Sequence, residues 1–131
     1  MKCIDSDLLV AILRGNADAQ SKMDELDTEG RNATTSINAF EIFYGAARSS
    51  KREKNLDEAK RMISRLEVMP LDIESANKAA VVAADLAEKG EQIDFRDVLV
   101  AGIALTNELS LVTKNARHFA RIRNLTLESW P

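Results

Sequence analysis

Short apolar runs alternate along this chain with longer amphipathic segments, and this alternation restricts the fold more than any other feature. Strands are predicted at residues 1–5, 33–35, 68–71, 109–113 and 125–128. Helices are predicted from Leu8 to about Gly15, over 17–29, from an N-cap at Ser36 through Ala47, and over 52–66, 73–89 and 95–107. Strands that alternate with helices indicate an α/β fold, a parallel sheet of about four to five short strands flanked by helices on both faces.

Length and composition agree with one compact unit. A chain of 131 residues, 45% of them hydrophobic and 30% charged, has the size and usage of a single globular domain, so we predict one domain over 1–131. The single Cys3 cannot form an internal disulfide, and the chain starts with no basic segment followed by an apolar signal core. No apolar stretch approaches the ~20 residues that cross a bilayer. We expect a cytoplasmic protein with no membrane role.

Acidic residues set in apolar sequence are the main functional signal. Asp5 ends the first apolar run, Glu41 interrupts another, and Asp97 stands directly before the apolar run that starts at Val98. Removing a carboxylate from water is costly unless a cation or hydrogen bonds compensate. One shared divalent metal site, with Asp94 as a further ligand, would answer these charges. Oxygen ligands select Mg²⁺ or Mn²⁺, and zinc is unexpected in a chain with one His and one Cys.

Structural roles compete with this interpretation. Asp94 could be the N-cap of the helix at 95–107, and Asp97 could compensate its first-turn dipole. Asp5 or Asp7 could cap the first helix, with Asp7 the better candidate for a pure cap. Glu41 could form a surface ion pair. The helix that carries Glu41 has an apolar stripe, which comprises Ile37, Phe40, Tyr44 and Ala47. Glu41 lies beside this stripe, so we expect its side chain to face inward or toward a cleft. The lone His118 is expected to be structural or to lie on the surface.

The net charge of −3 argues against a protein that coats nucleic acid by bulk charge. The chain nevertheless has two local basic clusters. The simplest explanation for each cluster is a solvated helix face. The first comprises Arg48, Lys51, Arg52, Lys54, Lys60, Arg61 and Arg65, and the second comprises Lys114, Arg117, Arg121 and Arg123. Asp5 and the pair Lys114-Asn115 follow predicted strands. Open parallel sheets bind ligands at those carboxyl ends.

In these residues the chain resembles the PIN-domain ribonucleases, especially the VapC-type toxins of prokaryotic toxin–antitoxin pairs. The resemblance spans nearly the whole chain, and its pieces are Ile4 to Leu9, Thr35 to Ala46, Asp97 to Ala104, Leu111 to Phe119 and the ending Leu125 to Trp130. Each segment alone is unspecific, but their occurrence together in this order is strong support for the resemblance. At the fourth acidic position the chain departs from the family, because relatives often carry Asp or Glu between Thr113 and Phe119, where Asn115 and His118 stand here.

The resemblance implies a Mg²⁺-dependent endoribonuclease, with Mn²⁺ as a possible replacement. Asp5 and Asp97 would hold the principal metal and Glu41 would orient water, with Thr113 and Asn115 placing the scissile phosphate. Arg48, Arg52, Lys114 and Arg117 would bind the RNA backbone. A small antitoxin partner and a homodimer are further implications of the family.

Two other functions are compatible with parts of the chain. A phosphoryl-accepting receiver domain also combines early acidic residues with a late Thr and Lys, but Asp72 is poorly placed as an acceptor. A PIN-like domain that has lost activity and only binds RNA or protein is the stronger alternative. A structure-specific 5′ nuclease acting on DNA is less expected, because those enzymes usually carry larger acidic sets and extra helices.

Overall fold

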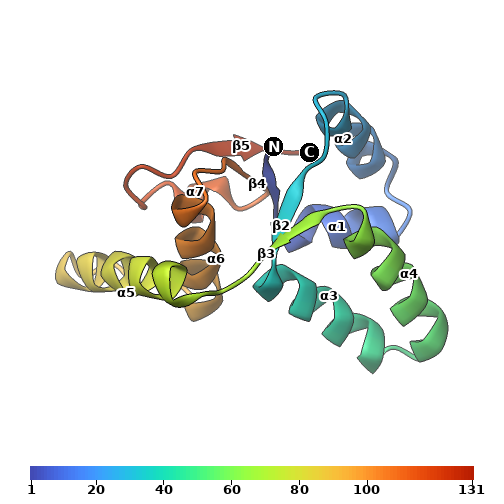
Figure 1. Ribbon diagram of the computed structural model, residues 1–131, viewed down its shortest axis with the longest axis horizontal. Coiled ribbons are helices and arrows are strands. Elements are labelled where there is room, and N and C mark those ends of the chain that lie inside the picture. Colours follow the sequence, from blue (N-terminus) through green and yellow to red (C-terminus); the bar gives the residue numbers. More distant parts are fainter.

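The computed structural model describes residues 1–131 and contains one parallel sheet (Figure 1). Its strands are β1 (Cys3–Ile4), β2 (Ala33–Thr35), β3 (Glu67–Met69), β4 (Leu111–Thr113) and β5 (Leu127–Ser129), in the spatial order β3-β2-β1-β4-β5. Every neighbouring pair is parallel. The predicted sheet is confirmed, and the expected strands at 1–5 and 109–113 are shortened to their buried centres.

The helices are α1 (Ser6–Leu13), α2 (Ala17–Asp27), α3 (Ser36–Arg48), α4 (Arg52–Ser64), α5 (Ile73–Glu88), α6 (Phe95–Thr106) and α7 (Ala116–Phe119). All except the short α7 were predicted, with ends that differ by one or two residues, as helix termini commonly do. None of these helices combines the length and apolar character needed to cross a bilayer.

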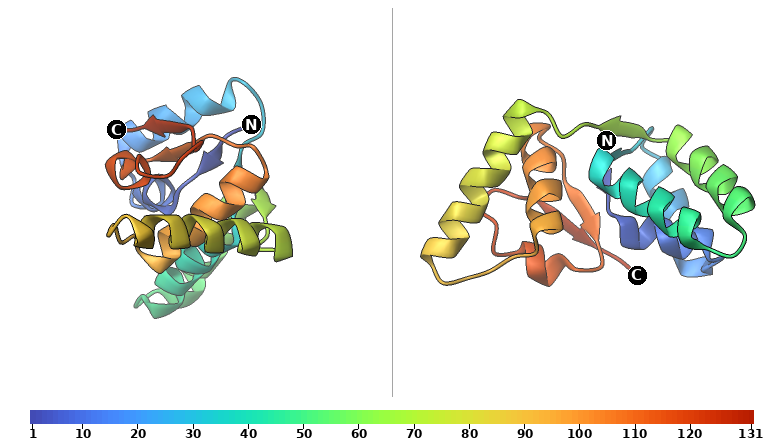
Figure 2. Two further views of the ribbon diagram at one scale, coloured as in Figure 1. Left: turned by 90° about the vertical axis from the view of Figure 1, so that its left-hand side faces the viewer. Right: turned by 90° about the horizontal axis from the view of Figure 1, so that it is seen from below.

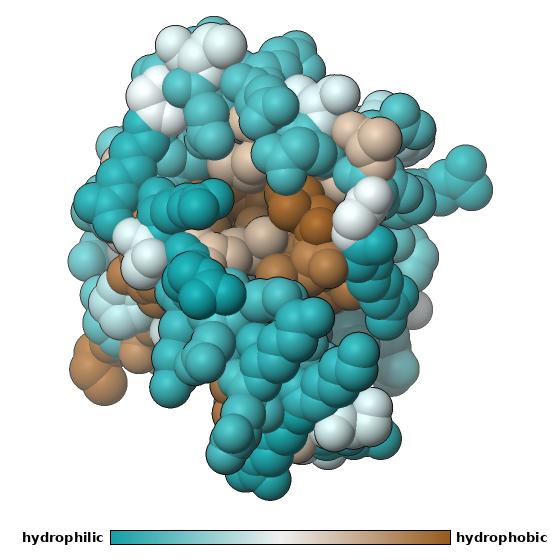
Figure 3. Space-filling view, turned by 90° about the vertical axis from the view of Figure 1, so that its right-hand side faces the viewer, coloured by the Kyte–Doolittle hydropathy of each residue, from teal (hydrophilic) through white to brown (hydrophobic).

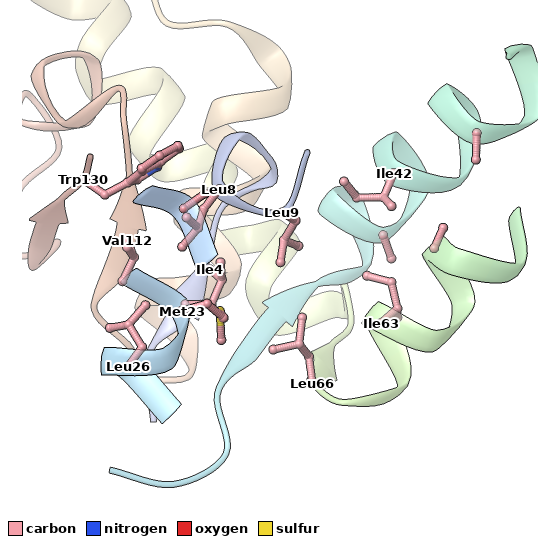
Figure 4. Close-up of a cluster of buried hydrophobic side chains, with 14 residues drawn as sticks. Ile4, Leu8, Leu9, Met23, Leu26, Ile42, Ile63, Leu66, Val112 and Trp130 are labelled. Atoms are coloured by element: carbon pink, nitrogen blue, oxygen red, sulfur yellow. The ribbon is translucent and has the colours of Figure 1, made fainter. Parts of the chain in front are cut away.

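The helices cover both faces of the sheet, as predicted. Figures 1 and 2 show α1 to α4 on one side and the packed pair α5 and α6 on the other. Side chains alternate along β1, so Ile4 joins the core beneath α1 to α4, while Cys3 joins the core beneath α5 and α6. Figure 4 shows the first of these cores, in which Leu8 and Leu9 of α1 surround Ile4. Each fully buried Leu or Ile contributes about 1.5–3 kcal/mol.

The predicted cap of α3 is wrong, and of the two candidates for the cap of α1 the less favoured one is correct. Thr35, the last residue of β2, caps α3, because its Oγ1 accepts a hydrogen bond from the backbone N of Asn38 at 3.1 Å. Ser36 is already helical, and its hydroxyl instead accepts from the backbone N of Leu71 at 3.1 Å. Asp5, and not Asp7, caps α1 through a bond from the backbone N of Ser6. In both cases the cap is the extended residue directly before the helix: Thr35 ends β2, and Asp5 follows β1.

The apolar stripe predicted on α3 is not its buried face. Phe40 and Tyr44 are 64% and 51% exposed, and their rings stack at a centroid distance of 5.7 Å. The buried face carries Asn38, Ala39, Ile42 and Ala46. Polar Asn38 is the reason for the discrepancy, because it turns inward to hydrogen-bond Asp5 and rotates the stripe of large apolar residues toward solvent.

Candidate active site at the carboxyl ends of the strands

The predicted acidic residues converge at the carboxyl ends of β1 and β4. Asp5 directly follows β1, Thr113 ends β4, Glu41 lies on α3 and Asp97 lies in the first turn of α6. These elements border a cleft of about 790 Å³. Asp5, Glu41, Asp94 and Asp97 all line it, together with Asn115. The parallel sheet explains the convergence, since the chain leaves β1 and β4 at the same edge.

Asp5 is held rigidly at the base of the cleft. Its carboxylate belongs to a residue only 1% exposed, and its Oδ1 accepts from the backbone N of Ser6 at 2.8 Å and from Nδ2 of Asn38 at 2.9 Å. Its Oδ2 accepts from Oγ1 of Thr113 at 2.7 Å. Donors from α1, α3 and β4 thus fix both oxygens of this carboxylate. Such a buried anion is tolerated because both of its oxygens accept hydrogen bonds.

Arg96 is the cation that joins the three predicted carboxylates. Its Nε donates to Oε1 of Glu41 at 2.8 Å, its Nη1 to Oδ1 of Asp97 at 2.6 Å and its Nη2 to Oδ1 of Asp5 at 2.5 Å. Burial alone would lower the pKa of Arg96, but the hydrogen bond to Glu41 and the charge of Asp5 outweigh it and hold that pKa above its ordinary value. Arg96 is therefore charged at every physiological pH.

The donor chemistry of the cluster fits a hard divalent ion. Carboxylate oxygens of Asp5, Glu41 and Asp97 surround one cationic position, and Ser6 contributes a hydroxyl that donates to Oε1 of Glu41 at 2.7 Å. Oxygen donors of this kind suit Mg²⁺ or Mn²⁺. The guanidinium separates the carboxylates, and no three acidic, His or Cys side chains close on a single ion-sized point in this arrangement. A metal at this position would take the place that the guanidinium holds.

A second carboxylate, Asp7, acts as a brace. Its Oδ2 accepts from the backbone N of Lys114 at 2.9 Å and lies 3.2 Å from Oγ1 of Thr113, whose proton makes the shorter bond to Asp5, and its Oδ1 accepts from Nε1 of Trp130 at 2.8 Å. The side chain of Lys114 also contacts Trp130, because its Nζ lies over the indole ring at 4.9 Å from the ring centroid. These contacts tie α1 to β4 and to the end of the chain. Asp7 is thus committed to the scaffold of the cleft.

The remaining predicted site residues lie at the rim. Asp94 occupies the N-cap position of α6, but its side chain makes no capping hydrogen bond and is exposed beside the cleft. Asn115 begins α7, and its backbone N donates to Oγ1 of Thr113 at 3.0 Å. His118 also borders the cleft, so it has a surface position at the site itself.

The basic residues predicted to bind RNA divide into two groups. Lys114 lines the cleft, whereas Arg48, Arg52 and Arg117 lie outside the set of residues that border it. Arg48 instead stacks over the ring of Tyr44 at 5.4 Å. Arg14, at the end of α1, lines the cleft and was not predicted.

Sequence reasoning missed several residues that organise the site. Asn38 precedes Glu41 by three residues, so the helical repeat could have placed both on one face toward Asp5. Arg96 stands between Asp94 and Asp97, where a lone cation among acidic residues was a usable signal. The bond between Trp130 and Asp7 spans 123 residues and left no local pattern to find.

Known proteins resemble the chain in sequence. The family described as "PIN domain" matches residues 2–125. The "tRNA(fMet)-specific endonuclease VapC" of Salmonella typhimurium is 38% identical over 100 residues, 76% of this chain and 76% of that protein. The "Ribonuclease VapC2" of Rickettsia felis is 30% identical over 130 residues, 97% of this chain and 96% of that protein.

Solved structures resemble the chain in fold. The VapBC2 structure from Rickettsia felis, bound to a DNA fragment from its promoter, superposes with a TM-score of 0.91 at 28% identity and covers 99% of this chain and 98% of that one. The DNA-bound VapBC structure from Salmonella typhimurium superposes with a TM-score of 0.90 at 31% identity and covers 100% of both chains.

Proposed function

Because the chain belongs to the PIN-domain family, we propose that it is a metal-dependent endoribonuclease and the toxin of a VapBC-type toxin–antitoxin pair. One observation carries this proposal: Asp5, Glu41 and Asp97, far apart in sequence, surround a single cationic position at the bottom of a cleft. Carboxylates gathered in this way supply the type of ligand that hydrolysis of a phosphodiester by a metal-activated water uses.

In this proposal Asp5 and Asp97 hold the principal Mg²⁺, for which Mn²⁺ can substitute, and Glu41 orients water beside it. A bound ion supplies the activation of water and neutralises charge on the phosphate. Thr113 and Asn115 position the scissile phosphate from the end of β4. Asp94 is exposed at the rim without a partner and is available as an additional ligand.

The chain lacks the fourth acidic residue between Thr113 and Phe119, and Asp7 is committed to the scaffold, where it bonds the backbone N of Lys114 and Nε1 of Trp130. One specific observation therefore favours a second candidate, a PIN domain without activity that binds RNA or protein. That observation is the guanidinium of Arg96, which already satisfies the three carboxylates of the cluster.

For the substrate we propose transfer RNA, and initiator tRNA first, because the Salmonella relative is named a tRNA(fMet)-specific endonuclease. Lys114 and Arg14 at the cleft are placed to contact phosphates beside the scissile bond. Arg48, Arg52 and Arg117 would contact more distant parts of the RNA. Access to cellular RNA requires a cytoplasmic protein, the location that we propose.

We also propose an antitoxin partner that covers an apolar surface. Figure 3 shows apolar side chains in a hollow on the side of the molecule that carries α1 to α4. These helices supply partly buried apolar residues around their core, among them Ile12, Leu13, Phe43, Leu56 and Met62. The solved VapBC structures pair such a chain with an antitoxin, some of them on DNA. A homodimer would bury the exposed rings of Phe40 and Tyr44.

The test is cleavage of initiator tRNA and a set of elongator tRNAs by purified protein in Mg²⁺, in Mn²⁺ and in EDTA. Asp5→Asn and Asp97→Asn are compared with Asp18→Asn, which removes an exposed carboxylate on α2. We expect metal-dependent cleavage by the wild type and Asp18→Asn alone. RNA binding without cleavage in either metal would instead establish the inactive candidate. Equal cleavage by Asp5→Asn would point to a contaminating nuclease.

A further inference from the structure

We propose that Arg96 is the resident counter-ion of the acidic cluster, and that a divalent metal enters only by displacing its guanidinium. The metal ion and the Arg96 guanidinium then exchange for one another in the acidic cluster. The strength of the Arg96 ion pairs therefore sets the metal affinity of the site. The inference rests on the proposed metal-dependent function and adds to it a residue of this chain that competes with the metal.

The geometry of the three bonds supports exchange rather than coexistence. Arg96 places a different nitrogen on each carboxylate, with N to O distances of 2.8 Å to Glu41, 2.6 Å to Asp97 and 2.5 Å to Asp5. The accepting oxygens are Oε1 of Glu41, Oδ1 of Asp97 and Oδ1 of Asp5. The other oxygen of Asp5 is already bonded to Thr113. An ion that binds Asp5 together with the other two carboxylates therefore competes with Arg96 for Oδ1 of Asp5.

The charge balance leaves a reason for a divalent ion to enter. Three carboxylates carry a charge of −3, and the guanidinium adds +1, so the group retains −2. A divalent ion in place of the guanidinium reduces the remaining charge to −1. Arg96 thus prevents the carboxylates from repelling one another in the absence of metal, but it neutralises them incompletely.

Arg96 is also placed so that it can leave. It lies in the first turn of α6 at the edge of the cleft, and 23% of its side chain is exposed. Its neighbour Phe95 is 79% exposed. When Arg96 moves, Asp5 keeps its bonds from Ser6, Asn38 and Thr113. The principal carboxylate would stay in place during the exchange.

The experiment is a calorimetric titration of metal-stripped protein with Mn²⁺, for the wild type, Arg96→Gln, Arg96→Lys and Arg14→Gln. Arg14 is the matched control, because it lines the same cleft and makes no ion pair, so its loss reports only the general effect of one positive charge. We expect Arg96→Gln to bind Mn²⁺ more tightly than Arg14→Gln by roughly 5- to 150-fold, the usual range for coupled sites. Arg96→Lys should lie between, since one ammonium cannot bridge three carboxylates.

A thermal melt of the same proteins separates competition from misfolding. In EDTA, Arg96→Gln should melt below the wild type, because the carboxylates lose their cation, and Mn²⁺ should raise its melting temperature more than that of the wild type. If Arg96→Gln does not fold, Arg96→Lys replaces it in the comparison. It should also melt below the wild type in EDTA and gain more melting temperature from Mn²⁺ than the wild type does. An affinity of the Arg96 variants equal to that of Arg14→Gln would overturn the exchange, even if the wild type cleaves RNA. A wild type that binds no Mn²⁺ would overturn both the exchange and the proposed function.

Discussion

Asn38→Ala is the substitution whose effect follows most directly from the structure. Asn38 is fully buried, and its Nδ2 donates to Oδ1 of Asp5 at 2.9 Å and to Oγ of Ser6 at 2.8 Å. Its Oδ1 accepts from Oγ1 of Thr35 at 2.7 Å and from the backbone N of Thr35 at 3.3 Å. The alanine variant loses all four of these bonds and leaves their partners without replacement.

The cost can be worked out bond by bond. A hydrogen bond to a charged group contributes about 1.5–3 kcal/mol and a neutral one about 0.5–1.5 kcal/mol, so the loss of one charged and three neutral bonds should cost roughly 3–7 kcal/mol of unfolding free energy. Domains of this kind are stable by only about 5–15 kcal/mol. With a urea dependence of about 2 kcal/mol per M, the unfolding midpoint should fall by about 1.5–3.5 M.

The assay is equilibrium unfolding in urea with EDTA present, followed by circular dichroism. Asn55→Ala is the matched control: Asn55 lies on α4, and its Nδ2 donates to Oγ of Ser49 at 2.8 Å. Losing this neutral bond should cost at most about 1.5 kcal/mol. If both variants unfold at the same urea concentration, Asn38 does not hold Asp5 in the way described here.

Three further predictions concern other parts of the molecule. Gly102→Ala should cost about 1–3 kcal/mol in a thermal melt, because the new Cβ would lie 2.7 Å from Cβ of Ala79, whereas Gly45→Ala meets nothing within 4 Å and should be neutral or stabilising. Burial, and then the charge of Asp5, raises the pKa of the Cys3 thiol from 9.0 to about 12. The folded protein therefore keeps a proton that the unfolded chain loses, so Cys3 should contribute stability below pH 9 that is lost as the pH rises toward 12, a loss absent from Cys3→Ala. Trp130→Phe should cost about 1.5–3 kcal/mol in urea unfolding through the lost bond to Asp7, and a variant as stable as the wild type would refute that brace.

Most of the fold was predictable because its determinants are local. Gly15, Gly30 and Gly90 adopt positive φ after α1, α2 and α5, and they mark the ends of these helices in the sequence. The alternation of strands and helices then implies a parallel sheet. The face of α3 was not predictable from hydrophobicity alone. Its large apolar residues suggested one orientation, but the hydrogen bonds of Asn38 with Asp5 and Thr35 decided another.

The members of the acidic cluster were predictable individually, because each carboxylate stands in a locally apolar segment. Their partners were not, since a partner depends on distances across the fold. Asp7 and Asp5 are two residues apart and chemically identical, yet one braces the chain's end through Trp130 and the other caps α1 at the base of the cleft. No property of the two residues by themselves separates these roles. The difference comes from the end of β4, where Thr113 donates its hydroxyl to Asp5 and the backbone N of the following Lys114 donates to Asp7.

The requirement for a cation was the strongest inference available from the sequence, because buried carboxylates cannot stand close together without one. The structure meets this requirement with Arg96, a residue one position before Asp97 on the same helix turn. A guanidinium and a hard divalent ion both need carboxylate oxygens of Asp5, Glu41 and Asp97, and in this structure the guanidinium holds those carboxylates apart. The carboxylates therefore define the cationic position, and the relative affinities of Arg96 and the metal decide which of them fills it. That competition is what the Mn²⁺ titration measures.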